Sequence, residues 1–349
     1  MTAHAAVRAV TVSVPGRLCL AGESLDWMTG GSSVVTAVPL RTRVTAWRAI
    51  GSTALALTSG PPLFNTRLIP AAHAAGRHYD GHVLDHMQAA VRVTLGQAEL
   101  IAGTVLTAST ELPVAAGLSS SAALTLAVVA ALGGLVGDPL ELARVCVLAR
   151  QAETDELGSG AGWMDFLACA HGGVNRVNAG EVPTVERIAP TLGIPVVVID
   201  TLQRRTTMRV LATKRARFEA REAAIVDYSR QASELVDAVT EVLTAKAVDY
   251  RQVGRLLNAG QDLLRDKVHC STDLIDTCAQ RVLAAGAFGT KLTGSGHGGC
   301  LFALVPDDAL TAVLEAVADL PVHAVALPAS EPQGLISSLP EPCPNATPA

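Results

Sequence analysis

Three consecutive serines, Ser119, Ser120 and Ser121, follow Gly117 and precede a run rich in Ala, Leu and Val that extends to Leu135. Glycine permits a tight turn with positive φ, and serine is favoured at the start of a helix. The first N–H groups of such a helix lack intrahelical partners and lie at the positive end of its dipole, which suits phosphate. The hydroxyls can add hydrogen bonds to phosphate oxygens or a ligand to magnesium. The stretch therefore predicts a phosphate-binding turn, and a capped core helix without a ligand is the alternative.

The same apolar run is also a candidate membrane span, because residues 112–137 carry no charge. A span needs about 20 consecutive apolar residues. The serines and Gly133-Gly134 bracket a much shorter apolar segment. We therefore expect a buried core helix and no membrane partner.

Two acidic residues, Glu153 and Asp165, stand in apolar surroundings. Glu153 continues the apolar face of a predicted helix, where a carboxylate is costly unless it is paired or bound to a metal. It is therefore a candidate magnesium ligand, and an ion pair with Arg150 is the alternative. The glycine-rich stretch 158–162 leads to Asp165, which could be a catalytic base facing a cleft or the cap of the short helix that follows.

Arg17, Glu23 and Asp26 lie within ten positions of one another, among glycine and apolar residues. Charges in such surroundings need partners, and a ligand with several hydroxyls would donate hydrogen bonds to the carboxylates. An Arg17–Glu23 ion pair and an Asp26 that caps a turn are the alternatives.

A second glycine-rich stretch contains Gly294, Gly296 and Gly299, whose spacing fits the dinucleotide fingerprint. That fingerprint should connect a strand to a helix, whereas residues 300–305 are typical of a strand. We therefore expect a hairpin that lines a phosphate or substrate cleft, with a simple tight turn as the alternative.

His78, His82 and His86 recur every four residues, a spacing that would place them on one face of a helix. Zinc binding lacks support from acidic or cysteine ligands at matching spacing, so we expect a solvated or substrate-facing surface. The seven cysteines are scattered and form no CxxC pair, which argues against a disulfide framework and a structural zinc site.

The chain has 349 residues, of which 49% are hydrophobic, enough for one large domain or two. Its net charge of −5, without a basic stripe, argues against a nucleic-acid partner. The first 14 residues lack the pattern of a signal peptide, so we expect a cytoplasmic protein.

Helices and strands must position the candidate site residues. Alternation predicts strands over 7–20, around a turn at Pro15-Gly16, and over 34–48. Asp138-Pro139 is expected to open a helix, and residues 194–200 a strand that begins a second domain. Further helices are expected near 214–245, 248–265 and 272–286, followed by a helix and a strand within 307–327. The tail, 329–349, is rich in proline and serine and is expected to be disordered.

Three motifs stand in order along the chain: PGRLCLAGESLDWMTGG, LPVAAGLSSSAA and KLTGSGHGGC. Together they resemble the GHMP kinase superfamily, which includes galactokinase, homoserine kinase, mevalonate kinase and phosphomevalonate kinase, over about residues 12–305. The resemblance implies an α+β fold with an N-terminal domain like ribosomal protein S5 domain 2, at 1–185. It also implies a ferredoxin-like C-terminal domain, at 190–328, with ATP and Mg²⁺ bound between the two.

The first motif is most similar to that of galactokinase. By that resemblance Asp165 is the catalytic aspartate, and Arg17 lies beside the transferred phosphoryl group. The implied nucleotide-binding residues are Pro113, Gly117, Leu118, Ser119, Ser120, Ser121 and Ala122. The implied magnesium ligands are Ser121 and Glu153. The implied substrate-binding residues are Glu23, Ser24, Asp26, Gly294, Ser295 and Gly296.

Four features depart from the galactokinase pattern. Ser24 and Leu25 replace its histidine and threonine, Phe166 replaces its glutamine, and 291–294 is closer to mevalonate kinase. Because these changes lie on the sugar side, the resemblance implies an ATP-dependent kinase for galactose or an unusual sugar, acting on the anomeric hydroxyl. A kinase for a non-sugar alcohol such as mevalonate and a catalytically silent sugar sensor are the alternatives. We expect a monomer or a homodimer.

Overall fold

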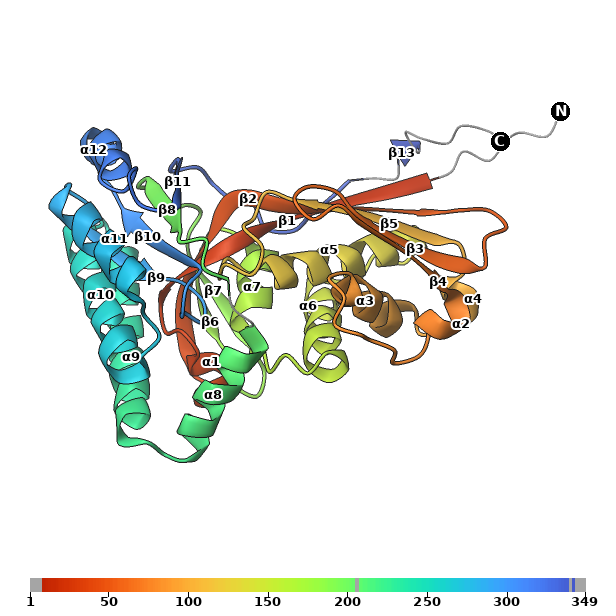
Figure 1. Ribbon diagram of the computed structural model, residues 1–349, viewed down its shortest axis with the longest axis horizontal. Helices are drawn as coiled ribbons and strands as arrows, with labels where there is room; N and C mark the ends of the chain where they lie inside the picture. The colour runs from red at the N-terminus through yellow and green to blue at the C-terminus, as the bar shows by residue number, and fades with distance from the viewer. Residues whose placement is uncertain (1–7, 205–206, 339–340, 343–349) are drawn as a thin grey trace.

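The computed structural model describes residues 8–204, 207–338 and 341–342, and it contains two β-sheets with helices packed on them (Figure 1). We call the larger sheet with its helices the first unit and the smaller sheet with its helices the second unit. Within the described residues, the larger sheet contains the order β12-β1-β2-β5-β3-β4, while β6 pairs with β2 and β7, and β13 pairs with β1. Its strands are β1 (Arg8–Ala21), β2 (Ser32–Arg48), β3 (Ala54–Ser59), β4 (Asn65–Pro70), β5 (Thr104–Thr110), β6 (Val174–Asn178), β7 (Thr184–Ala189), β12 (Ile336–Ser337) and β13 (Glu341–Pro342).

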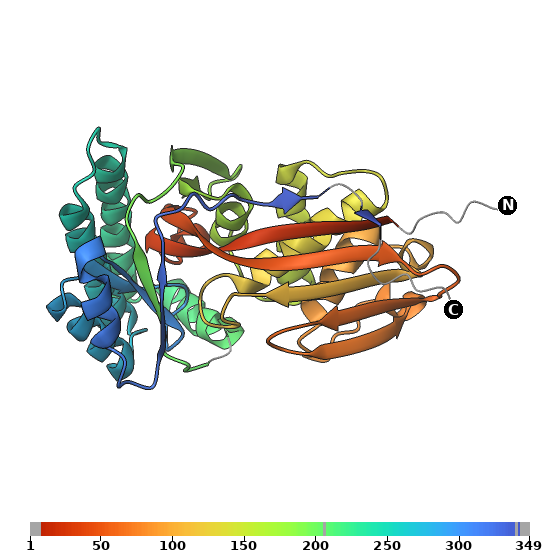
Figure 2. The same ribbon diagram turned by 90° about the horizontal axis from the view of Figure 1, so that it is seen from above.

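The helices of the first unit lie on one face of its sheet, and the opposite face is open to view in Figure 2. They are α1 (Leu25–Met28), α2 (Ala71–Ala74), α3 (Asp85–Leu95), α4 (Ala98–Ile101), α5 (Ser120–Leu135), α6 (Leu142–Gln151), a π-helical turn (Ala152–Glu156) and α7 (Met164–His171). Helix α5 packs against β1 and β2 and is flanked by α3, α6 and α7, which confirms the predicted core helix. No helix in the described part of the chain is both long and apolar enough to cross a membrane.

Strand β1 continues through Pro15-Gly16, so the turn predicted there is wrong. Its register against β2 instead shifts between Pro15 and Arg17, and proline, which lacks an N–H, is tolerated at such a bulge. Only glycine fits at the next position, because a Cβ on Gly16 would lie 2.4 Å from the Leu112 side chain and 2.7 Å from the Leu118 carbonyl oxygen. The bulge thereby brings the predicted phosphate turn against β1.

The second unit has the strand order β11-β8-β10-β9, with every neighbouring pair antiparallel. This β-α-β-β-α-β arrangement confirms the predicted ferredoxin-like fold. Its strands are β8 (Val196–Asp200), β9 (Gly289–Leu292), β10 (Cys300–Leu304) and β11 (His323–Leu327). Its helices are α8 (Thr207–Glu219), α9 (Ala223–Thr244), α10 (Tyr250–Leu263), a π-helical turn (Leu264–Val268), α11 (Asp273–Ala284), a short 3₁₀ turn (Asp307–Ala309) and α12 (Leu310–Glu315).

Two helix predictions need correction. The single helix expected near 214–245 is two helices, α8 and α9, because the chain turns at Arg221, which has a left-handed φ of 52°. Helix α6 begins at Leu142 rather than at Asp138-Pro139, where the backbone still forms the loop after α5.

The three histidines do not share one helical face as predicted, although His82 and His86 line the cleft between the two units, as expected of a substrate-facing surface. Helix α3 begins at Asp85, so His78 and His82 lie in the preceding loop and share no helical face with His86. The Asp85 carboxylate accepts hydrogen bonds from three backbone N–H groups of that loop, which fixes the loop at the start of α3. Within the described ranges, no group of His, Cys, Asp and Glu could hold a metal by itself, and the cysteines there are buried and form no disulfide.

The first part of the tail is ordered, contrary to the prediction for residues 329–349. Strand β12 pairs with β1, and the Arg41 guanidinium donates hydrogen bonds of 2.7 Å to the carbonyl oxygens of Gln333 and Gly334. Backbone pairing and an arginine compensate for the low hydrophobicity of this segment. The prediction for residues 339–340 and 343–349 lies outside the described residues.

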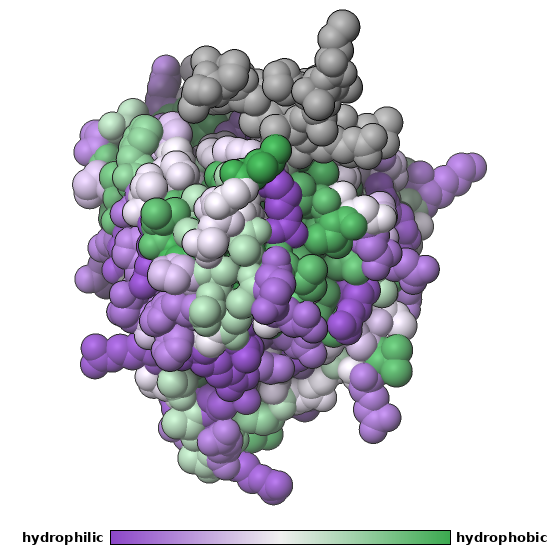
Figure 3. All heavy atoms as spheres, turned by 90° about the vertical axis from the view of Figure 1, so that its right-hand side faces the viewer, coloured by the Kyte–Doolittle hydropathy of each residue, from purple (hydrophilic) through white to green (hydrophobic). Residues whose placement is uncertain are grey.

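The surface of the end of the molecule that faces the viewer in Figure 3 mixes polar and apolar side chains.

Candidate active site

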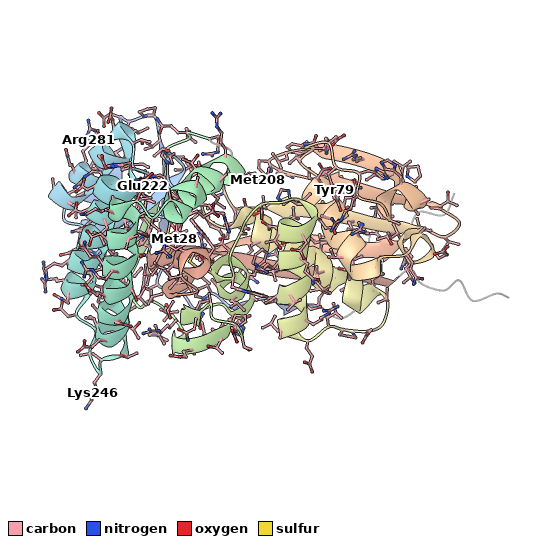
Figure 4. All side chains as sticks on the ribbon, turned by 90° about the horizontal axis from the view of Figure 1, so that it is seen from below. Met28, Tyr79, Met208, Glu222, Lys246 and Arg281 are labelled. Atoms are coloured by element: carbon pink, nitrogen blue, oxygen red, sulfur yellow. The ribbon has the colours of Figure 1, made fainter. Side chains whose placement is uncertain are left out.

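A cleft of about 780 Å³ lies between the two units, within the size range of small-molecule sites. The first unit contributes most of its wall, and the second contributes the β9–β10 loop and α8. Met208 of α8 and Tyr79 of the loop before α3 line it from different units (Figure 4). The predicted site residues that line it are Arg17, Glu23, Ser24, Asp26, Gly117, Ser119, Ser120, Ser121, Glu153, Asp165, Gly294 and Ser295. Pro113, Leu118, Ala122 and Gly296 do not line it.

The turn before α5 presents unused hydrogen-bond donors to the cleft. Ser119 occupies the N-cap position with a left-handed φ of 62°, and its side chain does not cap the helix, contrary to the prediction. The Ser119 hydroxyl is buried and lies within hydrogen-bond reach of the Cys169 thiol. Gly117, with φ 90°, is required here because a Cβ would lie 2.4 Å from the Thr293 carbonyl oxygen. This turn fits an anionic ligand, since its backbone and hydroxyl donors are free of side-chain caps.

Glu153 is a buried carboxylate at the π-helical turn after α6, with 4% of its surface exposed. Its two oxygens accept hydrogen bonds of 3.2 Å from the hydroxyls of Ser121 and Thr125. Burial, followed by the negative charge of Asp165, raises the pKa of Glu153 to about 8. The alternative partner, Arg150, instead lies over the Trp163 ring at 4.7 Å. A buried carboxylate beside a serine hydroxyl, without an ion-pair partner among the described residues, fits one edge of a divalent cation site.

Arg17 and Asp165 form the ion pair at the centre of the cleft. The Arg17 Nε and Nη2 atoms donate to one oxygen of Asp165 at 2.9 and 2.6 Å, and Nη1 donates to the Gly117 carbonyl oxygen at 2.5 Å. Burial opposes the charge on Arg17, but Asp165 raises its pKa above the ordinary value. The alternative Arg17–Glu23 pair is therefore wrong. Asp165 remains 31% exposed, so its carboxylate is accessible from the cleft.

Asp26, rather than Asp165, caps α7. Its Oδ2 atom accepts the N–H of Met164 at 3.1 Å, and its Oδ1 atom accepts the N–H of Trp27 at 3.0 Å. Burial raises the pKa of Asp26. Only glycine fits at Gly162, because a Cβ there would overlap the Asp26 carboxylate.

Glu23 is held by the second unit. Its buried carboxylate forms an ion pair with Lys291 of β9, and its carbonyl oxygen accepts a hydrogen bond of 2.6 Å from Tyr228 of α9. Ser24 follows with a left-handed φ of 68° and precedes α1. The acceptor-side loop of the first unit therefore depends on side chains more than 200 residues away.

The second glycine-rich stretch is a loop between antiparallel strands β9 and β10, which confirms the predicted hairpin. The Cys300 N–H donates to the Ala116 carbonyl oxygen at 2.7 Å, so the hairpin is tied to the phosphate turn. Gly296 faces away from the cleft, and a Cβ there would lie 2.4 Å from the Cys270 carbonyl oxygen. Glycine is therefore required there for packing, and its predicted substrate role stays a prediction.

Several lining or supporting groups were not predicted as site residues. Lys291 is the first residue of the motif KLTGSGHGGC, so it could have been considered. Pro61-Pro62, at the turn between β3 and β4, is a sequence pattern that predicts a turn. Tyr228 and Met208 carry no comparable signal, because they lie on helices whose orientation toward the cleft is a tertiary feature.

Comparison with known proteins supports the same fold and chemistry. The chain is 30% identical over 228 residues to a mevalonate kinase of Thermococcus sibiricus, an alignment that covers 64% of this chain and 67% of the relative. It is 29% identical to a galactokinase of Mycobacterium bovis over an alignment of 355 residues that covers 88% of this chain and 92% of the relative. Its fold matches the crystal structure of Lactococcus lactis galactokinase complexed with galactose at a TM-score of 0.80, with 22% identity, over 94% of this chain and 95% of the other.

Family models match both units. The model of the GHMP kinases N terminal domain matches residues 79–173, and that of the GHMP kinases C terminal matches residues 244–322. The chain belongs to the GHMP kinases, phosphotransferases with an alcohol group as acceptor.

Proposed function

We propose that this kinase transfers the γ-phosphoryl group of ATP to a sugar hydroxyl, with the anomeric hydroxyl of galactose or a related sugar as the acceptor. The supporting observation is the charge of the acceptor side. Among the described residues that line the cleft, Arg17 is the sole arginine or lysine, and Asp165 already pairs with it. Glu23 and Asp26 also line the cleft, whereas Lys291, which pairs with Glu23, does not, so an anionic acceptor would meet carboxylate oxygens and a neutral polyol would donate hydrogen bonds to them.

The phosphate side would take the nucleotide. The uncapped N–H groups of the first turn of α5 and the Ser119 and Ser120 hydroxyls would bind the phosphates. Ser121 and Glu153 would hold Mg²⁺, because the buried Glu153 carboxyl has no basic partner among the described residues and would lose its proton on binding the metal. When bound, Mg²⁺ would supply neutralisation of phosphate charge. Pro113, Leu118 and Ala122 would act through the backbone and packing of the turn.

Asp165 would accept the proton of the attacking hydroxyl. Its accessible carboxylate is held by two hydrogen bonds from Arg17, which fix its direction. General-base assistance of this kind contributes about 10²–10⁴-fold. Arg17 would also stabilise charge on the migrating group, because its guanidinium lies between Asp165 and the phosphate turn.

A mevalonate-type kinase is the second candidate, and one observation favours it: a mevalonate kinase is among the relatives at 30% identity. A silent sensor would have no need to keep the Arg17–Asp165 pair.

The deciding experiment is ADP release from ATP and Mg²⁺ across galactose, other hexoses, heptoses, uronic acids, amino sugars and mevalonate. Phosphorus NMR of the product would locate the ester. An anomeric sugar phosphate is the expected result, and turnover of mevalonate alone would overturn the sugar assignment. ATP binding with silence on every acceptor would favour the sensor.

A further inference from the structure

Lys291 is a fully buried lysine, with 1% of its surface exposed; it lies behind Glu23 rather than in the lining of the cleft, and the proposed chemistry does not use it. A buried lysine is uncommon unless it is paired. Its ammonium forms an ion pair with Glu23 and donates a hydrogen bond of 2.9 Å to the Leu292 carbonyl oxygen. The partner carboxylate belongs to the first unit and the lysine to the second, so the pair crosses the boundary between them.

The stem of Lys291 is tightly packed. A Cβ on Gly260 of α10 would lie 3.0 Å from the Lys291 Cδ atom, so glycine leaves the space that the stem occupies. The ammonium lies 5.9 Å from the centre of the Phe302 ring. A stem packed in this way limits the positions that the ammonium can take, and therefore the position of the Glu23 carboxylate.

Other side chains of the second unit hold the same loop and the end of strand β1 that leads into it. The Tyr228 hydroxyl donates to the Glu23 carbonyl oxygen at 2.6 Å, and the Thr293 hydroxyl accepts the Cys19 N–H at 3.1 Å. A Cβ on Gly22 would lie 2.8 Å from Val236 of α9. Backbone contacts therefore place the loop, and the Lys291 ammonium is the contact that acts on the Glu23 carboxylate itself.

We propose that Lys291 is a positioning residue for acceptor binding: its ion pair orients Glu23 and balances its charge, so that one Glu23 oxygen can accept a hydrogen bond from a neutral acceptor hydroxyl. This rests on the proposed acceptor role of Glu23. ATP binding should be independent of Lys291, because no described residue of the phosphate turn contacts its ammonium.

The protonation of Lys291 gives the proposal a pH signature. Burial lowers its pKa to about 7, Cys19 opposes that shift, and Arg17 adds to it. Glu23 faces the ammonium from the first unit, and Tyr228 contacts Glu23 from α9. Because its pKa is lowered, the Lys291 ammonium is lost at a lower pH than that of an exposed lysine, so the KM for the acceptor should rise as the pH is raised, whereas an arginine would stay protonated.

The test measures KM for D-galactose and for ATP in Lys291→Met, Lys291→Gln and Lys291→Arg across pH 6–9. The Met variant should raise the galactose KM by about tenfold or more, since it leaves Glu23 buried and unpaired, with ATP KM within about twofold. The Gln variant keeps a hydrogen-bond donor near Glu23 without the positive charge. It is the variant to measure if the Met variant does not fold. The Arg variant should restore much of the galactose affinity and flatten its pH dependence.

Lys246→Met is the matched control, because Lys246 is exposed and projects from the far end of the second unit (Figure 4). Equal changes in both KM values, or an unchanged galactose KM in the folded Met or Gln variant, would overturn the proposal. A pH dependence that survives in the Arg variant would also count against it. If mevalonate alone is turned over, the proposed function fails, and the same KM ratio measured with mevalonate still decides the role of Lys291.

Discussion

The two sides of the cleft are built differently. The phosphate side comes from one contiguous turn, Gly117–Ser121, together with Glu153, all in the first unit. The acceptor side joins Glu23 and Asp26 to partners that come from other parts of the chain, namely Lys291, Tyr228 and the N–H of Met164. Nucleotide binding should therefore depend on local structure, and acceptor binding on how the two units meet.

The sides also differ in how far their polar groups are satisfied. On the phosphate side the buried Glu153 carboxyl accepts hydrogen bonds from two hydroxyls, but no lysine or arginine among the described residues forms an ion pair with it. On the acceptor side the carboxylate of Glu23 is balanced by a lysine and that of Asp26 accepts two backbone N–H groups. A buried polar group left unpaired is costly, so the phosphate side is the side whose stability should respond most to its ligand.

The largest effect should come from the residue between the two sides. Asp165→Asn should lower kcat by about 10²–10⁴-fold, because the amide cannot accept the acceptor proton, while ATP affinity is retained. Turnover by coupled ADP release and ATP binding by calorimetry measure the two quantities. Asp155→Asn, at an exposed position ten residues earlier, is the control. Near-normal turnover of the Asp165 variant would remove the base assignment.

A substitution at Glu153 should have a smaller effect, confined to the phosphate side of the cleft. Glu153→Gln should raise the Mg²⁺ concentration needed for half-maximal activity by about tenfold to a hundredfold, with an unchanged acceptor KM. Titration of Mg²⁺ at fixed ATP measures this. An unchanged Mg²⁺ requirement would exclude Glu153 as a ligand.

The same carboxylate predicts a pH dependence with a definite sign. Its pKa is raised from 4.5 to about 8, so the folded state favours the protonated form. Without Mg²⁺, its contribution to stability should decline as the pH rises from 4.5 toward 8. Mg²⁺ affinity should fall by about tenfold per pH unit as the pH drops below about 8, because protons compete with the metal. The Gln variant should lose both dependences.

A substitution at Tyr228 should have the smallest effect, confined to the acceptor side of the cleft. Tyr228→Phe removes the hydroxyl that holds the Glu23 carbonyl, which should cost about 1–3 kcal/mol in the free energy of unfolding. It should raise the acceptor KM by about twofold to fivefold and leave the ATP KM unchanged. Tyr250→Phe is matched to it, because the Tyr250 hydroxyl also donates to a backbone carbonyl, that of Leu192, at 2.8 Å, away from the cleft. A similar change in acceptor KM in both variants would mean that the effect is only one of stability.

Some of the site was predictable because its residues are neighbours in the chain. The serine triplet, the glycine before it and the apolar run after it predict a buried helix that begins at a phosphate turn, and the helix forms there. The hairpin at 293–299 was predictable for the same reason, since glycines followed by a continuous apolar stretch favour a turn before a buried strand.

Pairings between distant residues could not be predicted in this way. Arg17 was a reasonable partner for Glu23 by proximity in sequence, but the bulge at Pro15 and the packing of α7 place it against Asp165. Asp165 was a reasonable helix cap, but Asp26 takes that role from 138 residues away. The ordered segment 329–338 was missed because its stability comes from β1 and Arg41 rather than from its own composition.

The sequence by itself determined the elements and the chemical types: a serine turn at a helix start, two isolated carboxylates, a glycine-rich hairpin, and three motifs in order. Backbone preferences and burial of apolar side chains are properties of short stretches, so these follow from the residues. Only the tertiary structure decided which charge meets which. A buried charge must find its counterpart wherever the packed units bring one, and for Glu23 that counterpart is Lys291, which belongs to the second unit and lies 268 residues later in the chain.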